Sequence, residues 1–129
     1  MSYWFIKSPF KTRGWQEVIM SGRFSLYGIR NYQARKNISE MQVGDIALFY
    51  HKKAIYGEMQ VVCTAYPDPT SSENWLAIDF IPVKTFKEPL EIEELKQNEA
   101  FQTVFKQPRL SVVKLGIFEQ NIYLFEHNL

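Results

Sequence analysis

The sequence contains very little cysteine and no long hydrophobic run. Cys63 is the single cysteine among 129 residues, which excludes an internal disulfide and any zinc site with several cysteines. A single cysteine also agrees with a reducing compartment. Apolar runs such as residues 46–50 are far shorter than the roughly 20 residues of a membrane span. The N-terminus lacks the apolar core of a signal peptide. We therefore expect a cytoplasmic protein with no membrane partner.

Motifs that carry catalysis or bind cofactors are also missing. The chain has neither HExxH nor paired histidines at metal-ligand spacing, and neither GxGxxG nor GxxxxGK[ST]. Glu91, Glu93 and Glu94 are typical of the first turn of a helix, where acids complement the helix dipole. Cys63 lies in an apolar stretch and is expected to be an inert thiol in the core of a strand. We expect no metal, no cofactor and no catalytic residue, and hence a protein that is not an enzyme.

Aromatic residues are plentiful, and charge is unevenly spread. The chain has 3 Trp, 7 Tyr and 10 Phe. Residues 1–57 hold nine Lys or Arg against three acids, a net charge of +6, whereas residues 58–129 carry a net charge of −5. A basic half rich in aromatic rings offers cations for phosphates and flat faces for bases. This pattern favours a nucleic-acid surface, with chance segregation of charge as the alternative.

Local patterns predict short strands and a few helices, with turns between them. Expected strands cover residues 3–6, 46–51, 54–66, 75–86 and 110–115, and expected helices cover 15–20, 92–105 and 116–129. Residues 23–37 are expected to be a loop with at most one helical turn, and residues 67–74 a loop. Gly22 is expected to end the first helix, and Gly57 to form a bulge or a point of close approach. Pro82 is expected to bend its strand or bring it to an edge. Long strands without regular helical crossovers predict an α+β fold with a mostly antiparallel, barrel-like sheet and peripheral helices.

The segment GIRNYQARKN at residues 28–37 is the densest group of polar binding side chains. Three cations and three amides surround one aromatic ring: Arg30, Arg35 and Lys36, then Asn31, Gln33 and Asn37, around Tyr32. Guanidinium groups suit phosphates, and amides can pair with base edges. The alternative is a solvated, amide-rich loop that caps a helix.

This string also carries a family resemblance. Six segments occur in order along the chain: YWFIKS (3–8), GIRNYQARKN (28–37), MQVGDIALFYH (41–51), AYPDPT (65–70), WLAIDF (75–80) and RLSVVKL (109–115). Together they resemble the EVE domain family of the PUA-like superfamily. The resemblance implies one EVE domain over residues 1–129, folded as a twisted β pseudo-barrel with helices around a cleft. It also implies binding of a modified nucleobase, chiefly modified cytosine in DNA, with the base flipped out.

Three departures from the family pattern bear on which base is bound. Pro9 follows Ser8 directly, where the family usually has Glu. Leu26-Tyr27 precede Gly28, where the family usually has Trp-Asp. The connection after His51 is shorter than usual.

A base pocket needs aromatic walls, polar groups for the base edge and cations for phosphates. The wall candidates are Trp4, Trp15, Tyr32, Phe49, Tyr50 and Trp75. The edge candidates are Ser8, Asn31, Asn37, His51 and Ser111. The phosphate candidates are Lys7, Arg30, Arg35 and Arg109. Each aromatic residue has the alternative role of a core side chain.

Two function classes follow, with the first favoured. The first is a non-catalytic module that recognises a modified base in DNA or RNA. The second is an enzyme that acts on a modified nucleobase, nucleoside or RNA in the same cleft; for it the sequence offers only His51 and scattered acids. A small-molecule or protein-interaction module is a third reading. The residues leave open whether a nuclease or modification enzyme acts beside the protein, and its oligomeric state.

Overall fold

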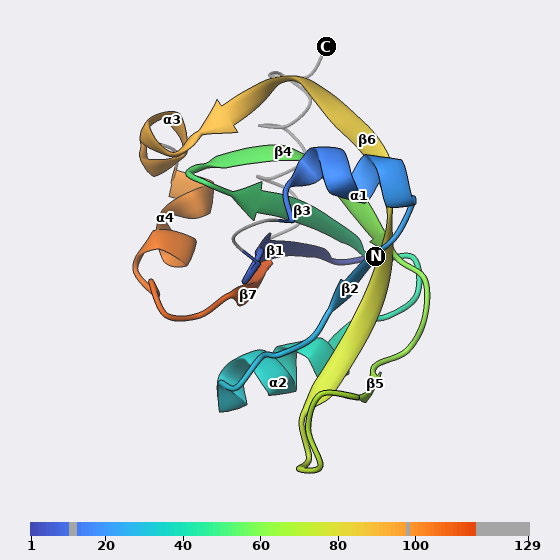
Figure 1. The fold of residues 1–129 in the computed structure, drawn as a ribbon. Coiled ribbons are helices and arrows are strands. Elements are labelled where there is room, and N and C mark those ends of the chain that lie inside the picture. Colours follow the sequence, from blue (N-terminus) through green and yellow to red (C-terminus); the bar gives the residue numbers. More distant parts are fainter. Residues whose placement is uncertain (11–12, 98, 116–129) are drawn as a thin grey trace.

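The computed structural model describes residues 1–10, 13–97 and 99–115. These residues form a seven-stranded sheet and four flanking helices (Figure 1). In chain order the elements are β1 (Tyr3–Lys7), α1 (Trp15–Ser21), β2 (Phe24–Leu26), α2 (Tyr32–Glu40), β3 (Ile46–His51), β4 (Ala54–Val61), β5 (Tyr66–Pro67), β6 (Leu76–Glu91), α3 (Ile92–Lys96), α4 (Glu99–Phe105) and β7 (Val112–Leu115).

The strands follow the order β2-β6-β4-β3-β1-β7, and the short β5 pairs with β6 outside this path. β1 runs parallel to β3, and the other described pairs are antiparallel. α1 lies by the upper half of β6, and α2 lies at the lower end of the sheet, where it packs against β6 and β7 (Figure 1). The expected α+β class, a mostly antiparallel curled sheet with peripheral helices, is confirmed.

The curled sheet surrounds a core of large apolar side chains. Phe5, Leu48, Phe49 and Phe80 are fully buried. Phe24 meets Phe49 edge-on, with ring centroids 5.3 Å apart, in a geometry that aromatic pairs favour. Burying each such side chain contributes about 1.5–3 kcal/mol, so the central strands are the most strongly held part of the fold.

Several element ends agree with their sequence signals. The strands expected at 3–6 and 46–51 are β1 and β3. α1 ends at Gly22, whose φ of 72° lies in the left-handed region where glycine is the favoured residue. The β3–β4 register shifts between Phe49 and Tyr50, opposite Gly57, and the β4–β6 register shifts beside Gly57. The bulge predicted at Gly57 is therefore confirmed.

The prediction of a loop at the start of residues 23–37 is wrong, because Phe24–Leu26 form β2. This strand is only three residues long and has no alternation that a sequence reading could detect. It forms because Phe24 and Leu26 pair with Phe80 and Ile78 of β6. A distant partner, rather than local propensity, decides its structure.

The end of the same segment begins α2, a nine-residue helix that is longer than the single helical turn expected there. The side chain of Asn31 caps the helix by accepting a hydrogen bond from the Ala34 amide at 2.9 Å. Ala34 and Ile38 lie four residues apart, and both are buried, so they form the inward face of the helix. The helix could not be predicted from composition, because exposed polar residues such as Lys36 outnumber the few apolar residues of this stripe.

β6 is longer than the expected strand at 75–86. It continues through Pro82, which pairs with Met59 next to a register shift. The described β2 pairs with residues 78–80 alone, so Pro82 lies beyond the reach of β2 and its missing N–H breaks no β2–β6 bond. The predicted irregularity at Pro82 is thus present within a continuous strand.

The remaining expectations hold with changed boundaries. The strand expected at 54–66 ends at Val61, and the one at 110–115 begins at Val112. The helix expected at 92–105 is split into α3 and α4. The helix expected at 116–129 lies outside the described residues. None of the helices in the described ranges has the length and apolarity to span a membrane.

The expected position of Cys63 inside a buried strand is also wrong. β4 ends two residues earlier, at Val61, and Cys63 is half-buried beyond it. The apolar run continues past the last paired residue, which is why a reading of hydrophobicity extended the strand too far. Cys63 still packs against the edge of the hydrophobic core.

Candidate nucleic-acid interface

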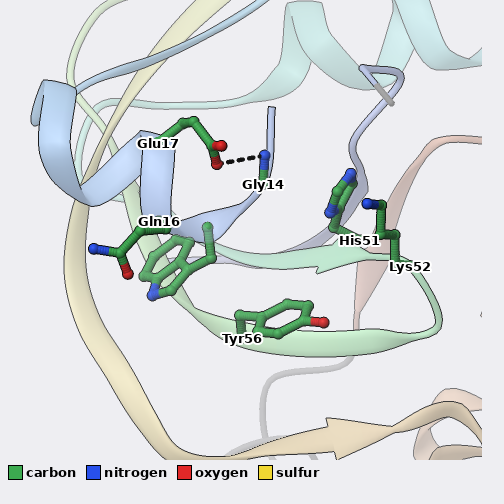
Figure 2. Close-up of a pocket in the computed structure, with 7 residues that line it drawn as sticks. Gly14, Gln16, Glu17, His51, Lys52 and Tyr56 are labelled. Carbon is green, nitrogen blue, oxygen red and sulfur yellow. Dashed lines mark hydrogen bonds between the residues drawn. The ribbon is translucent and has the colours of Figure 1, made fainter. Parts of the chain in front are cut away.

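A pocket of about 490 Å³ opens between the start of α1 and the turn that joins β3 to β4 (Figure 2). This volume lies within the range of roughly 300–1,000 Å³ that small-ligand sites occupy. The lining residues combine two aromatic rings with four polar side chains and one glycine: Gly14, Trp15, Gln16, Glu17, His51, Lys52 and Tyr56.

Trp15 is the most firmly held wall of this pocket. Its indole N–H donates to Thr85 Oγ1 at 3.0 Å, and its ring lies 5.3 Å from that of Phe49. A Cβ built on Gly57 would overlap the indole ring and the Lys84 carbonyl oxygen. The glycine therefore leaves the room in which the ring lies against β4. A ring fixed in this way needs no reordering to stack on a ligand.

His51 is fixed by a hydrogen bond to the backbone. Its Nε2 lies 3.1 Å from the carbonyl oxygen of Phe10. A carbonyl oxygen can only accept, so Nε2 carries the proton, and Nδ1 of the neutral ring is an acceptor. Nδ1 lies on the side of Gly14, 3.4 Å from where a Cβ on that residue would be. The missing side chain of Gly14 thus leaves an acceptor accessible at the pocket wall.

Glu17 places a carboxylate at the same opening. Its Oε2 accepts a hydrogen bond from the Gly14 amide at 3.0 Å, which caps the first turn of α1 (Figure 2). The capping bond occupies one oxygen, and an ionised carboxylate has further acceptor positions. Glu17 and His51 therefore present two acceptors from different elements to one space.

The turn between β3 and β4 brings a cation to the rim. Lys52 and Lys53 have positive φ angles of 46° and 69°. Positive φ at both central residues is typical of a two-residue hairpin whose twist matches that of the strands. The backbone of two non-glycine residues in this region costs on the order of 1–3 kcal/mol each, and the paired strands hold it there. Lys52 consequently points its exposed side chain along the pocket (Figure 2).

Trp15 and His51 were expected to bind the base, and both line this pocket. Four other side chains that line it were not expected: Gln16, Glu17, Lys52 and Tyr56. The pair Gly14 and Glu17 has the spacing of a helix cap, which is the signal that could have found Glu17. Tyr56 reaches the site because β4 folds back along β3, which is a long-range event.

A second group of predicted residues gathers elsewhere, around α2 and the segment before β6. Tyr32 stacks on Trp75 with ring centroids 5.2 Å apart and an angle of 29° between the planes. The guanidinium of Arg35 lies 5.1 Å from the Tyr32 ring and 5.5 Å from the Trp75 ring. The structure does not bring Tyr32 to Trp15, although both were expected to be walls of one pocket.

Arg30 joins the second group but is paired. It donates to the buried carboxylate of Asp68 at 3.0 Å and to Thr70 Oγ1 at 3.2 Å. Burial opposes ionisation of Asp68, but hydrogen bonds from Thr70, Gly28 and Arg30 outweigh it and hold its pKa well below the usual range. The GIRN and AYPD segments are thereby tied together, and the charge of Arg30 is largely committed to this link.

The predicted polar residues Asn31 and Asn37 have structural bonds. Asn31 caps α2, as described above. Asn37 is buried, and its amide donates to the Val112 carbonyl oxygen at 2.6 Å, which fastens α2 to β7.

The other predicted polar residues lie near the ends of β1 and β7. The Ser8 hydroxyl accepts from the Phe10 amide at 3.4 Å, and the Ser111 carbonyl accepts from the Lys7 amide at 2.9 Å. Lys7 Nζ donates to the Gln107 carbonyl oxygen at 3.3 Å, and its pKa is lowered by burial. Lys7 and Tyr50 share one depression of about 310 Å³, and Asn31 and Arg109 share another of the same volume.

Trp4 and Phe49 belong to the core instead of a pocket wall. Trp4 is 1% exposed, and its indole N–H donates to Asp45 Oδ2 at 3.0 Å. Phe49 is fully buried among other rings. Both lie on central strands whose inward faces are enclosed by the curl of the sheet, so a ligand cannot reach them without opening the core.

Comparisons with known proteins agree with this architecture. A family model described as the EVE domain matches residues 2–120. Mouse thymocyte nuclear protein 1 is 31% identical over 156 residues, covering 88% of this chain and 68% of that protein. A Pseudomonas putida protein structure is 31% identical with a TM-score of 0.87, over 99% of this chain and 100% of the other. Human THYN1, solved in complex with 5-methylcytosine-containing DNA, is 26% identical with a TM-score of 0.86, over 100% and 99% of the two chains. This chain belongs to the EVE domain family.

Proposed function

We propose that this protein is a non-catalytic module that binds a modified cytosine of DNA in the pocket between α1 and the β3–β4 turn. The observation that carries the proposal is the convergence of Trp15, Glu17 and His51 on one space, an aromatic wall beside two acceptors. The human relative crystallised with 5-methylcytosine-containing DNA supports the choice of ligand.

The polar groups of the pocket suit the edge of cytosine. The exocyclic amino group of cytosine is a donor with two hydrogens, and carboxylates are its usual side-chain partners. Glu17 and the Nδ1 atom of His51 supply two acceptors for it. The remaining edge atoms of cytosine are acceptors, which the ammonium group of Lys52 can satisfy from the rim. Two acceptors and one donor at the pocket are thus the types of group that the cytosine edge requires.

The aromatic rings of the pocket contribute to the binding free energy by stacking, in addition to the hydrogen bonds at the base edge. Stacking a base on an aromatic side chain contributes roughly 1–3 kcal/mol, whereas extruding a base from a duplex costs a few kcal/mol. Stacking on Trp15 and Tyr56 alone would therefore barely offset extrusion. The edge hydrogen bonds and the attraction of Lys52 for the phosphate backbone provide the surplus.

Catalysis is the alternative, and the lining residues favour binding over it. His51 is the one imidazole among them, and its Nε2 is bonded to Phe10. The residues lining this pocket include no cysteine, serine or threonine that could serve as a nucleophile. For the same reason we propose that the protein reads a modified base and does not act as an enzyme. We also propose that it acts in the cytoplasm, a reducing compartment in which its single cysteine stays reduced.

The proposal is tested by titrating matched duplexes that contain cytosine or 5-methylcytosine at one position. The wild type should prefer the methylated duplex, and Glu17→Gln should weaken binding to both, because it removes the charge that receives the amino group. Gln can still accept from the Gly14 amide, so the helix cap survives. The control is Glu88→Gln, the same change at an exposed position of β6. Equal affinity of the wild type for the two duplexes, or consumption of the ligand with time, would overturn the proposal. Matched RNA duplexes in the same assay test the other nucleic acid.

A further inference from the structure

The ring of Tyr32 is exposed to an unusual degree for a residue in an aromatic stack. The side chain is 72% exposed, whereas its partner Trp75 is 8% exposed. Trp75 is held in place by a hydrogen bond, in which its indole N–H donates to Glu73 Oε2 at 3.2 Å. The stack therefore has a fixed inner ring and an outer ring that faces solvent. An exposed aromatic face of this kind is what a nucleobase needs for stacking.

Cations border the same ring. Arg35 lies against both aromatic rings and donates to the Asn74 carbonyl oxygen at 3.1 Å, which leaves further guanidinium N–H groups for another acceptor. Lys36 follows it along the exposed side of α2. The nearby charges of Arg30 and Asp68 compensate each other, and Glu73 faces the indole of Trp75. The exposed carboxylate of Glu73 keeps its charge, because an indole N–H is neutral, so Arg35, Lys36 and Glu73 together leave a net charge of +1 beside Tyr32.

These side chains border a shallow depression of about 520 Å³. Its lining mixes the ring, both cations and several amide or hydroxyl groups: Tyr32, Gln33, Arg35, Lys36, Ser39, Asn74 and Leu76. We call this depression, together with Trp75 beneath Tyr32, the Tyr32 surface. It is separate from the pocket at α1, because α1 and α2 lie at opposite ends of the sheet (Figure 1).

We propose that the Tyr32 surface is a second nucleic-acid contact, which binds an unpaired nucleotide without regard to base modification. One base stacks on the solvent-facing side of Tyr32, and the adjoining phosphates lie against Arg35 and Lys36. Gln33 lines the same depression; its Nε2 donates to Asn37 Oδ1 at 3.0 Å, which leaves its carbonyl oxygen as an acceptor for a base edge. This deepens the proposed function, since it assigns the flanking strand a place that the pocket at α1 does not provide.

The stacking is tested with a ten-residue oligothymidine, measured by fluorescence anisotropy. Tyr32→Ala should weaken binding roughly tenfold or more, which is the effect expected from losing one base–aromatic stack. Tyr32→Phe should bind as the wild type does, because it keeps the ring. Both variants should fold, since the side chain is exposed, and circular dichroism checks this. The control is Val43→Ala, which shortens another exposed apolar side chain, one that does not line the Tyr32 surface.

A second arm separates the ring from the cations. An oligonucleotide with abasic residues has phosphates but no bases, so Tyr32→Ala should leave its affinity unchanged. Arg35→Gln should weaken both oligonucleotides and reduce the slope of log affinity against log salt by about one. The control for charge is Lys106→Gln, at the exposed position that follows α4.

The outcomes that overturn this inference differ from those that overturn the proposed function. Three results would each reject the Tyr32 surface as a nucleotide contact. Tyr32→Ala could bind oligothymidine as tightly as the wild type, or Tyr32→Ala and Tyr32→Phe could lose the same affinity. The wild type could also bind polyglutamate, a polyanion without bases, as tightly as oligothymidine. Preference for methylated duplexes could still hold in those cases. Conversely, Tyr32-dependent binding of oligothymidine without any preference for methylcytosine would reject the reader and keep this surface.

Discussion

Trp15 lies over Gly57, at the one place on β4 where the missing side chain leaves room for an indole ring. The relationship joins a helix to a strand that is distant in sequence and fixes the inner wall of the candidate pocket. Gly57 also lies where the register of β4 with both neighbouring strands is irregular. Pocket shape therefore depends on a residue that contributes no side chain.

We predict that Gly57→Ala destabilises the protein and weakens ligand binding together. The added methyl group would overlap the Trp15 ring and the Lys84 carbonyl oxygen, and overpacking of this kind costs about 1–3 kcal/mol. Urea denaturation and titration with methylcytosine duplex measure the two effects. Gly22→Ala is the control: its φ of 72° makes it lose stability as well, but it faces open space and should keep its affinity. An unchanged denaturation midpoint for Gly57→Ala would contradict the packing described here.

A second prediction concerns acid stability and the buried carboxylate of Asp68. Its pKa in the folded protein lies well below the value of about 3.9 expected for an unfolded chain. The ionised form is therefore favoured by folding, and the stabilisation is complete above about pH 4 and is lost as the pH falls below that value. Asp68→Asn should be less stable at pH 7 by about 1–3 kcal/mol, because it weakens the bonds from Arg30 and Thr70.

The measurement is the free energy of unfolding between pH 7 and pH 2. The wild type should lose more stability than Asp68→Asn on going from pH 4 to pH 2, because the variant has no charge to neutralise there. Glu88→Gln, an exposed change of the same type, should follow the wild type. Parallel pH profiles for wild type and Asp68→Asn would show that this carboxylate does not govern acid stability.

A third prediction separates a structural role from a ligand-binding role at Asn31. Its side chain caps α2 through the Ala34 amide, so Asn31→Ala should cost about 1 kcal/mol of stability. Asn31→Asp preserves the cap and should restore most of that loss. Thermal denaturation of the two variants gives the comparison. If both kept full stability but lost the preference for methylated duplexes, Asn31 would act on the base edge, as the sequence alone suggested.

The sequence was informative where structure is decided locally. The end of α1 could be predicted because Gly22 is a strong local signal, and the buried strands could be predicted from their apolar runs. β2 could not, because three residues become a strand only when β6 pairs with them. Apolar character alone also extended a strand as far as Cys63, beyond the last residue that has a partner.

In the candidate site, too, the roles of the residues depend on partners that are distant in sequence. Trp15 and Tyr32 are both aromatic residues in the basic half of the chain, and nothing in the sequence separates a pocket wall from a surface platform. The structure separates them, because one ring is buried against Gly57 and the other lies exposed on Trp75. Arg30 and Arg35 likewise read alike in sequence, and the partner Asp68 distinguishes them.

The last prediction separates attraction to phosphates from recognition of the base. Adding a methyl group to a base buries apolar surface at roughly 25 cal/mol per Å², which amounts to roughly 1 kcal/mol. The wild type should therefore prefer methylcytosine over cytosine by several-fold to tens-fold.

Lys52 stands at the rim of the pocket, where its charge attracts any nucleic acid equally. Lys52→Gln should weaken both duplexes by the same factor, reduce the salt slope by about one, and leave the methylcytosine preference unchanged. Titrations of both duplexes at several salt concentrations, with Lys106→Gln as the control, measure all three quantities. A preference that fell with Lys52→Gln would mean that the ammonium group does more than contact the phosphates and the edge atoms that cytosine and methylcytosine share. A slope that stayed constant would remove Lys52 from the nucleic-acid interface, because a cation that displaces no counterions makes no phosphate contact.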